Sequence, residues 1–310
     1  MYKYFFKRLL MIIPILLGVA LVIFFILQLT PGDPGTMILG AGGDQTAIDR
    51  LNEELGYNRP VLERFFSYLY NVVFKLDFGS SYRTRLPVID NIRGRIPVSI
   101  TLAFSTILFA SVIGIPIGVL SAVKQYSLLD TVPTVISLFM AALPGFWLGM
   151  MMMYFFSLKL GWLPSNGVGS WQHFILPVVS LGLPYAAQEL RFTRSSMLET
   201  IRQDYVRTAR AKGANERLVI WKHALKNALL PVITVTGGNF GVLLGGAVVT
   251  ESLFNIPGLG SLIITSIKIK DVPTVMGATL ILAFIFSLIL LGVDLLYAAV
   301  DPRIKAKYSK

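Results

Sequence analysis

Six long apolar segments constrain the fold of this chain more than any other feature. They are Leu9–Leu29, Val98–Val123, Thr131–Leu158, a segment within Trp171–Gln188, Ala228–Thr250 and Val272–Val293. An apolar helix of about 20 residues is long enough to cross the hydrocarbon core of a bilayer. An open sheet could not cross, because backbone groups in lipid must be paired within the chain. The sequence therefore predicts an all-α membrane protein with six transmembrane helices.

The composition agrees with a membrane class and excludes several kinds of chemistry. Of the 310 residues, 54% are hydrophobic and 15% are charged, whereas a soluble domain carries about 25% charged residues. There is no cysteine, which excludes disulfides, thiolate metal sites and thiol nucleophiles. The only histidines, His173 and His223, fall on opposite sides of the predicted membrane. We therefore predict no metal site and no catalytic residue.

The first apolar segment could be a cleaved signal peptide or a retained span. Lys3, Lys7 and Arg8 precede it, as in a signal peptide. However, the apolar part of a signal peptide is about 7–15 residues long and ends in small residues. Leu9–Leu29 is longer and is followed by Thr-Pro-Gly-Asp-Pro. We interpret it as a retained first span.

Lys and Arg residues predict the orientation, because loops on the cytoplasmic side carry an excess of them. They gather in the N-terminus, in the loop 191–228 and in the tail from Arg303 to Lys310, with Lys124 in the loop after the second span. Both termini and the 191–228 loop are therefore predicted to be cytoplasmic. The net charge of +11 comes from basic residues in the loops beside the spans. We therefore predict that the chain's partner is a lipid bilayer and not a nucleic acid.

The loop 31–97 is the one predicted external segment long enough to form a small domain. Asp44–Leu55 has helix character, and Pro60–Lys75 is apolar at helical spacing. The second helix places these residues near one face: Leu62, Phe65, Phe66, Leu69 and Val73. Two interpretations stay open. The face packs on the outer end of the membrane domain, or it receives an external partner.

The stretch Asp204–Pro231 is basic and lies between two apolar segments. It is typical of two short helices, the first capped by Asp204 and the second by Asn215, with Gly213 at the break. In the second helix these residues line one face at helical spacing: Leu218, Trp221, Leu225 and Leu229. Such a charged hairpin cannot lie in lipid. It either docks a soluble partner or rests on the membrane surface as an amphipathic helix.

Four stretches in order resemble the permeases of ABC importers. Arg207-Thr208-Ala209, three residues and then Gly213, followed by Leu230-Pro231, resembles their "EAA" loop, in which Glu-Ala-Ala precedes three residues and a Gly. Only Ala209 and Gly213 match that pattern. The other stretches are Leu29-Thr30-Pro31-Gly32-Asp33-Pro34, Phe254-Asn255-Ile256-Pro257-Gly258-Leu259-Gly260 and Asp301-Pro302-Arg303. The variant resembles the B-type permease of the dipeptide, oligopeptide and nickel importer family.

This resemblance implies a type I importer fold in three parts: 1–30 with the first span, a helical external insertion at 31–97, and a permease core at 98–310. It implies as partners a second homologous permease, two cytoplasmic ATPase subunits and an extracytoplasmic solute-binding protein. In the family, the 191–228 loop docks the ATPase, which assigns coupling here to Tyr205, Arg207, Thr208, Ala209, Arg210 and Gly213. The chain has no phosphate-binding G-x-x-x-x-G-K-[ST] loop. We therefore expect ATP and Mg on the partner ATPase, with no cofactor and no enzymatic activity on this chain.

Two questions stay open. Glu189, Glu251 and Asp294 lie at predicted span ends, where acidic residues serve a substrate path, a permease–permease contact or the structure itself. The substrate is predicted to be a di- or oligopeptide, with a nickel chelate or glutathione as alternatives. Two alternatives come from other classes. The chain could be a self-sufficient channel or secondary transporter whose basic loop binds anionic lipid, or a membrane scaffold without transport.

Overall fold

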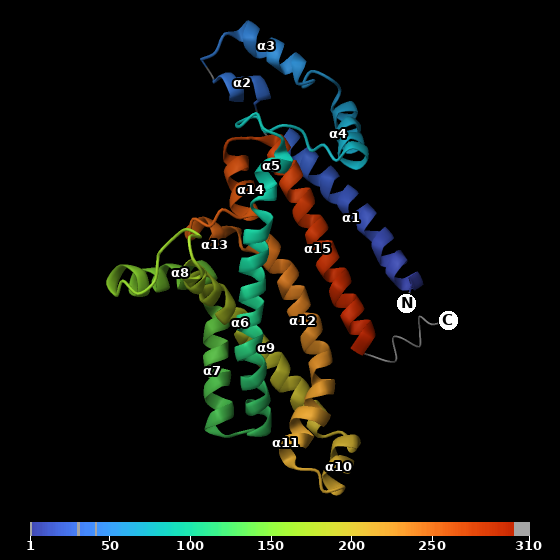
Figure 1. Ribbon diagram of the computed structural model, residues 1–310, viewed down its shortest axis with the longest axis vertical. Coiled ribbons are helices and arrows are strands. Elements are labelled where there is room, and N and C mark those ends of the chain that lie inside the picture. Colours follow the sequence, from blue (N-terminus) through green and yellow to red (C-terminus); the bar gives the residue numbers. More distant parts are fainter. Residues whose placement is uncertain (1, 30–31, 41, 301–310) are drawn as a thin grey trace.

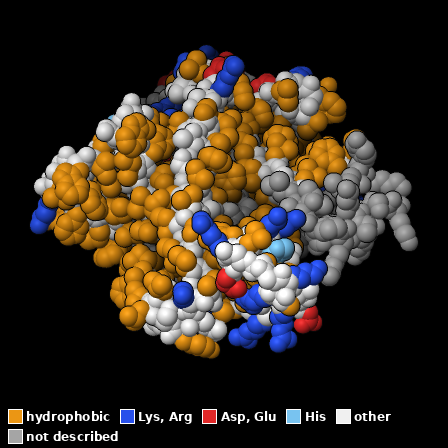
Figure 2. All heavy atoms as spheres, turned by 60° about the horizontal axis from the view of Figure 1, so that its bottom comes forward, with side chains coloured by type: hydrophobic (Ala, Val, Ile, Leu, Met, Phe, Trp, Pro, Cys, Tyr) orange, Lys and Arg blue, Asp and Glu red, His pale blue; other side chains and the backbone are white. Residues whose placement is uncertain are grey.

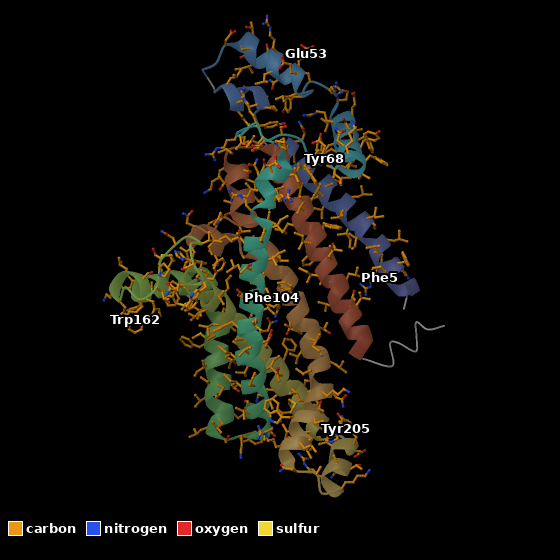
Figure 3. The ribbon with its side chains drawn as sticks, viewed as in Figure 1. Phe5, Glu53, Tyr68, Phe104, Trp162 and Tyr205 are labelled. Carbon is orange, nitrogen blue, oxygen red and sulfur yellow. The ribbon has the colours of Figure 1, made fainter. Side chains whose placement is uncertain are left out.

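The computed structural model describes residues 2–29, 32–40 and 42–300, and most of them are helical. Figure 1 shows an elongated bundle with the helices of the external insertion at one end and the basic hairpin at the other. Glu53 and Tyr205 mark these two ends (Figure 3). Within the described residues the only β pairing is an isolated bridge between Ser80 and Pro87. The all-α prediction is confirmed.

Long apolar helices form the membrane-spanning part. Four described helices are long and apolar enough to cross a bilayer, and a bent pair would make a fifth. The four belong to α1 (Tyr2–Gln28), α6 (Ile96–Val123), α12 (Leu225–Gly246) and α15 (Val272–Val300). The helix α9 (Ile175–Ile201) has the length to cross, but its second half carries charged side chains and it lies outside this set. The count of six spans stays a prediction.

The third predicted span is not one helix. It consists of α7 (Leu128–Ala142) and α8 (Gly145–Met152), and α8 continues as the π-helical η1 (Met153–Lys159). The helices before and after residues 143–144 are bent by 100° relative to each other. Leu143 between them is extended, with φ −80° and ψ 131°. Pro144 is the cause, because a proline ring disfavours the helical conformation of the preceding residue. The predicted span Thr131–Leu158 is therefore a bent pair of helices and not one straight helix, and α8 points sideways out of the bundle (Figure 1).

The fourth and fifth spans also differ from their predicted bounds. After a short 3₁₀ turn, η2 (Trp171–Phe174), α9 runs through Ile201, so the loop predicted to begin at 191 starts inside a helix. The fifth helix, α12, ends at Gly246, and α13 (Val248–Leu253) follows it. The helix α14 (Leu259–Lys268) then leads into α15.

Small residues allow α6 and α9 to pack closely. A Cβ atom on Gly114 would lie 2.5 Å from the carbonyl oxygen of Ala186, and one on Gly118 would lie 2.7 Å from that of Leu190. These glycines are four residues apart, which is the spacing of close helix–helix contacts in membranes. Larger side chains would push the two helices apart, so the glycines fix α9 against α6.

The external insertion is helical, as predicted for its middle part. It contains α2 (Pro34–Leu39), α3 (Gln45–Glu54), α4 (Val61–Lys75) and α5 (Val88–Arg93). Phe65 of α4 is buried, and its ring centroid lies 5.2 Å from that of Phe24 on α1. Leu62, Phe66 and Val73 are exposed. The interpretation that this face packs on the membrane domain therefore holds for Phe65 and for the half-buried Leu69. The exposed residues of the same stripe keep the second interpretation, an external partner, as a prediction.

Candidate functional site

The short helix α10 (Asp204–Ala211) stands at the end of the molecule opposite the external insertion. Figure 2 shows Lys and Arg side chains gathered on this end, with apolar surface on the neighbouring helices. Charged groups avoid hydrocarbon, so this end lies in water. The basic end is the part of the described surface on which a soluble partner would meet a protruding helix.

One side chain anchors α10 to the bundle. Val206 is 0% exposed and belongs to an apolar cluster with Met197 of α9 and Val119 of α6. Val219, at the start of the π-helical η3 (Val219–Ala224), is in the same cluster. Because these contacts come from three helices, a displacement of α10 would be passed to α6, α9 and the start of α12.

The predicted coupling residues of α10 fall on two sides of the helix. Tyr205, Arg207, Thr208 and Arg210 are exposed, and the Thr208 hydroxyl donates to the carbonyl oxygen of Asp204 at 2.8 Å. Ala209 is half-buried against the apolar cluster. The structure therefore brings five predicted side chains together on one short helix but turns Ala209 partly inward.

The start of α10 differs from the predicted one. Gln203 occupies the cap position with extended backbone, and Asp204 is the first helical residue. From there the Asp204 side chain makes no cap hydrogen bond, and its carboxylate lies 3.9 Å from the guanidinium of Arg207. The prediction of Asp204 as the cap is wrong, because the preceding residue already has the conformation that a cap requires.

The turn after α10 confirms the predicted break. Gly213 has φ +77°, which is the left-handed region that favours glycine. Arg210 closes the turn with two hydrogen bonds to the Glu216 carboxylate, at 2.7 and 3.0 Å. Asn215 caps the next helix, α11 (Glu216–Leu218), by accepting from the backbone N–H of Arg217. The turn is thus held by one left-handed residue and one ion pair.

The predicted apolar face of the second helix is wrong in part. Leu218 and Trp221 are exposed, while Val219, Ile220 and Leu225 are buried. The reason is η3, because a π-turn has more residues per turn than an α-helix and shifts the register of the residues that follow. Leu225 and Leu229, which follow η3, pack in or against the apolar cluster of Val206. The α-helical spacing therefore selects the correct face for these two residues and the wrong one for Leu218 and Trp221.

Sequence reasoning missed the ion pair that holds α9 just before α10. Asp130 of α7 is buried and accepts from Arg194 Nε at 2.6 Å and from Nη2 at 2.9 Å. The Ser121 hydroxyl and the backbone N–H of Tyr126 also donate to this carboxylate. The one signal in the sequence is an isolated Asp at the start of an apolar helix. An Asp is common near a helix N-terminus for electrostatic reasons, so this signal does not identify Arg194 as its partner.

The three acidic residues singled out from the sequence lie inside the chain's own packing or between its helices. Glu189 of α9 is 0% exposed and accepts from the Thr236 hydroxyl of α12 at 2.9 Å. Asp294 of α15 lies 2.9 Å from the guanidinium of Arg8 on α1. Both therefore join helices of this chain. A role for Glu189, Glu251 or Asp294 in the substrate path or in a contact between permeases stays a prediction.

Glu251 explains the glycine-rich stretch before the last span. Its carboxylate accepts from the Ser99 hydroxyl at 2.6 Å and from the backbone N–H of Ser261 at 2.9 Å. A Cβ atom on Gly258 would collide with this carboxylate, and one on Gly260 would lie 3.1 Å from it. The Phe254–Gly260 stretch is thus a loop wrapped around one buried acid, which ties α13 and α14 to α6.

The two other stretches of the family pattern are described only in part. Asp33 caps α2, and its carboxylate accepts from the backbone N–H of Thr36 at 2.8 Å and from the Asn52 amide at 2.6 Å. Residues 30–31 and the Asp301-Pro302-Arg303 stretch lie outside the described residues. The basic tail from Arg303 to Lys310 lies outside them too. In the described ranges, no group of three or more His, Cys, Asp or Glu residues could hold a metal ion.

The chain matches known proteins along nearly its whole length. Residues 114–306 match the family described as binding-protein-dependent transport system inner membrane component, and residues 1–103 match its N-terminal counterpart. The glutathione transport system permease protein GsiC of Escherichia coli (strain K12) is 41% identical over 307 residues, which cover 99% of this chain and 100% of that protein. The protein of the same name from Salmonella typhi is 42% identical over the same share of both chains.

Solved structures support the same fold. An inward-facing structure of the MetNI methionine ABC transporter aligns with a TM-score of 0.57 at 21% identity, over 69% of this chain and 97% of that chain. A crystal structure of an amino acid ABC transporter aligns with a TM-score of 0.51 at 15% identity, over 69% of this chain and 94% of the other. At these identities the likeness concerns the fold.

Proposed function

The chain belongs to the family of inner membrane components of binding-protein-dependent transport systems, the permease subunits of ABC importers, and we propose that it carries short peptides across the cytoplasmic membrane. The family consists of transport components and not of enzymes. Glutathione, itself a tripeptide, is the specific candidate, because relatives named for its transport are 41% identical along the whole chain. A di- or oligopeptide is the broader one.

The proposed mechanism places the coupling step at α10. The carrying observation is that Val206 is enclosed in the bundle while Tyr205, Arg207 and Thr208 of the same short helix stand in solvent. A helix anchored on one face and exposed on the other can be held by a soluble partner and can still move the bundle. We assign that partner as an ATPase subunit that binds ATP and Mg, with a second permease and a second ATPase completing the complex.

Movement of α10 has a defined route into the membrane helices. The cluster around Val206 joins it to α6, α9 and η3. The pair Arg194–Asp130 then ties α9 to the start of α7, and the glycines of α6 hold α6 against α9. These contacts make a rigid unit. When the two ATPases close, this unit rocks against the corresponding unit of the second permease. The path between the two permeases then opens to one side of the membrane and afterwards to the other.

The proposed orientation puts α10 in the cytoplasm and the external insertion outside, where it helps to receive the solute-binding protein. The native chain has no cysteine, so a single cysteine introduced at Ser80 or at Lys212, both exposed, reports its side without background. A membrane-impermeant maleimide added to intact spheroplasts should label Ser80→Cys and spare Lys212→Cys. Labelling of both from outside would contradict the orientation.

The functional test is uptake by the purified complex. Affinity-tagged full-length chain should co-purify with an ATP-hydrolysing subunit. Proteoliposomes containing that complex, loaded with ATP and given the solute-binding protein, should accumulate labelled glutathione or a labelled dipeptide. Uptake without ATP would instead favour a self-sufficient transporter. If neither solute is taken up while the ATPase is active, the peptide assignment is wrong but the family assignment is not.

A further inference from the structure

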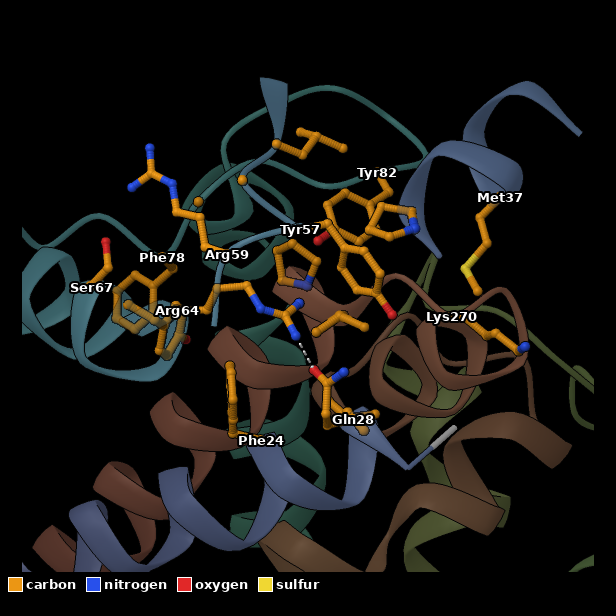
Figure 4. A pocket seen from close by; sticks show the side chains of 18 of the residues that line it. Phe24, Gln28, Met37, Tyr57, Arg59, Arg64, Ser67, Phe78, Tyr82 and Lys270 are labelled. Carbon is orange, nitrogen blue, oxygen red and sulfur yellow. Dashed lines mark hydrogen bonds between the residues drawn. The ribbon is translucent and has the colours of Figure 1, made fainter. Parts of the chain in front are cut away.

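A cavity of about 400 Å³ lies between the external insertion and the outer ends of the membrane helices (Figure 4). Its walls come from three parts of the chain: Phe24 and Gln28 at the end of α1, Arg64 and Tyr68 on α4, and Lys270 in the turn before α15. The volume lies in the range of small-molecule sites. The cavity is at the opposite end of the bundle from α10, so the coupling mechanism does not use it.

Arg64 has one polar group left over after its contacts are assigned. Its Nη2 donates to Gln28 Oε1 at 2.6 Å, and its guanidinium carbon lies 4.5 Å from the centroid of the Tyr57 ring. Its Nε is buried and has no hydrogen-bond partner in the described part of the chain. An arginine side chain stays charged in proteins, and a buried donor without an acceptor is unfavourable. Arg64 is therefore held in place by two neighbours, while its buried Nε–H has no acceptor among the described residues.

Tyr68 offers a second unmatched donor. It lies one helical turn after Arg64 on α4, so both side chains are on the same face of that helix. Its hydroxyl is buried and is likewise without a partner among the described residues. Burial raises the pKa of Tyr68 above its ordinary value, so this hydroxyl keeps its proton and remains a donor. Two donors on one face match two oxygen atoms of one anionic group.

The charge of the cavity lining and the position of the cavity along the membrane helices restrict the chemical class of the ligand further. Its lining holds Arg59, Arg64 and Lys270 but only one carboxylate, Glu54. Gln28, which accepts from Arg64, is the last residue of α1, where the apolar span ends. Arg64 therefore lies at the boundary between the hydrocarbon core and the polar headgroups. The Phe24 ring provides apolar lining next to it.

We propose that this cavity binds a phosphate or carboxylate carried on an apolar body, with Arg64 and Tyr68 donating to the oxygen atoms and Phe24 contacting the apolar part. Two sources carry this chemistry. An anionic phospholipid of the outer leaflet presents its phosphate at this depth. A short peptide with apolar side chains presents a terminal carboxylate from the aqueous side.

The test is a titration of the full-length chain, purified in detergent with the subunits that accompany it, followed by thermal unfolding. One arm uses dihexanoyl phosphatidylglycerol below its micelle concentration, and the other uses dileucine. We expect one probe to raise the unfolding temperature with saturation, and the arm that does so identifies the source. Tyr68→Phe should weaken that probe about tenfold, the usual effect of losing one hydrogen bond to a charged group.

Two further variants keep the test decisive. Arg64→Lys retains the charge but removes the Nε donor, and it should also weaken the probe. Arg50→Gln removes an exposed cation of α3 outside the cavity lining and should leave the affinity unchanged. Tyr68→Phe loses only an unmatched hydroxyl, so it should fold like the wild type. The proposal is overturned if neither probe saturates, or if Tyr68→Phe binds the active probe as tightly as the wild type does.

Discussion

Arg194 of α9 and Asp130 of α7 form a two-point ion pair, with nitrogen–oxygen distances of 2.6 and 2.9 Å, close to the point where α9 leads into α10. The Asp130 side chain is 5% exposed and that of Arg194 is 26% exposed. A charge with so little solvent around it depends on its partner. The pair therefore fixes the position of α9 and, through it, the direction in which α10 is held.

Removing Arg194 should destabilise the chain and loosen the coupling. Arg194→Ala leaves the Asp130 carboxylate buried without its cation, which costs about 3 kcal/mol in comparable sites. Thermal unfolding in detergent should show the loss, and ATP hydrolysis should continue with less uptake per ATP. Arg202→Ala, at the exposed end of the same helix, is the matched control and should behave like the wild type. Equal unfolding temperatures for the two variants would remove the proposed role of the pair.

Replacing Gly213 should affect coupling more than assembly. Its φ is +77°, and no atom lies within 4 Å of a Cβ placed there, so a side chain would meet strain and not a clash. Gly213→Val costs roughly 1–2 kcal/mol of backbone strain and should lower ATP-driven uptake at near-normal membrane expression. Gly213→Asn, which tolerates the left-handed conformation better, should retain most of the uptake. If valine and asparagine give the same uptake, the conformation of this turn does not matter for coupling.

Charge reversal on the exposed side of α10 should weaken the ATPase contact. Arg207→Glu changes a side chain that is 76% exposed, so its effect cannot come from lost packing. Less ATPase should co-purify with this variant than with Lys222→Glu, an exposed residue of η3 with the same charge change. Ala209→Glu should weaken the contact too. It is a less clean test, because Ala209 packs partly against the apolar cluster. Normal ATPase recovery with Arg207→Glu would favour the lipid-binding interpretation of the hairpin.

The external insertion should be needed for uptake but not for assembly. Deleting Asp44–Lys75 would also remove Phe65, which packs against α1, so a milder change is preferable. Asp49→Lys together with Glu53→Lys alters only exposed residues of α3. Uptake that depends on the solute-binding protein should fall, while the recovery of ATPase with the permease stays normal. Unchanged uptake would show that α3 does not take part in receiving that protein.

The order of α2 should depend on pH through Asp33. Hydrogen bonds from Thr36, together with one from Asn52, lower the pKa of Asp33 below its ordinary value. Its stabilising effect is therefore complete above the unfolded pKa of about 4 and is lost as the pH falls through the lower folded value. Hydrogen exchange of residues 34–39 should be constant from pH 7 to pH 5, after correction for the intrinsic rate, and should rise in stronger acid. Asp33→Asn should remove this acid-dependent step.

Local signals in the sequence were enough for most of the helices and for the class of the protein. The apolar segments predicted α1, α6, α12 and α15 to within a few residues at most ends, since the length of an apolar run is a local property. Gly213 and Asn215 were also identified correctly, because left-handed turns and helix caps depend on the residue itself. The resemblance of short stretches to importer permeases was confirmed by matches over nearly the whole chain.

Which polar groups meet and which helix faces are buried follows from the packing of the helices and could not be predicted from local patterns. The bend at Pro144 and the π-turn at Val219–Ala224 each changed the register that a regular α-helix would have. The pair Arg194–Asp130 joins residues 64 positions apart, and Glu251 is enclosed by a loop and by a serine 152 positions away. Such contacts follow from how the helices pack and not from any local pattern. Local patterns and the resemblance of four short stretches were enough to predict a helical importer permease. The inward turn of Ala209, the anchoring of Val206 and the cavity beside Arg64 depend on long-range packing.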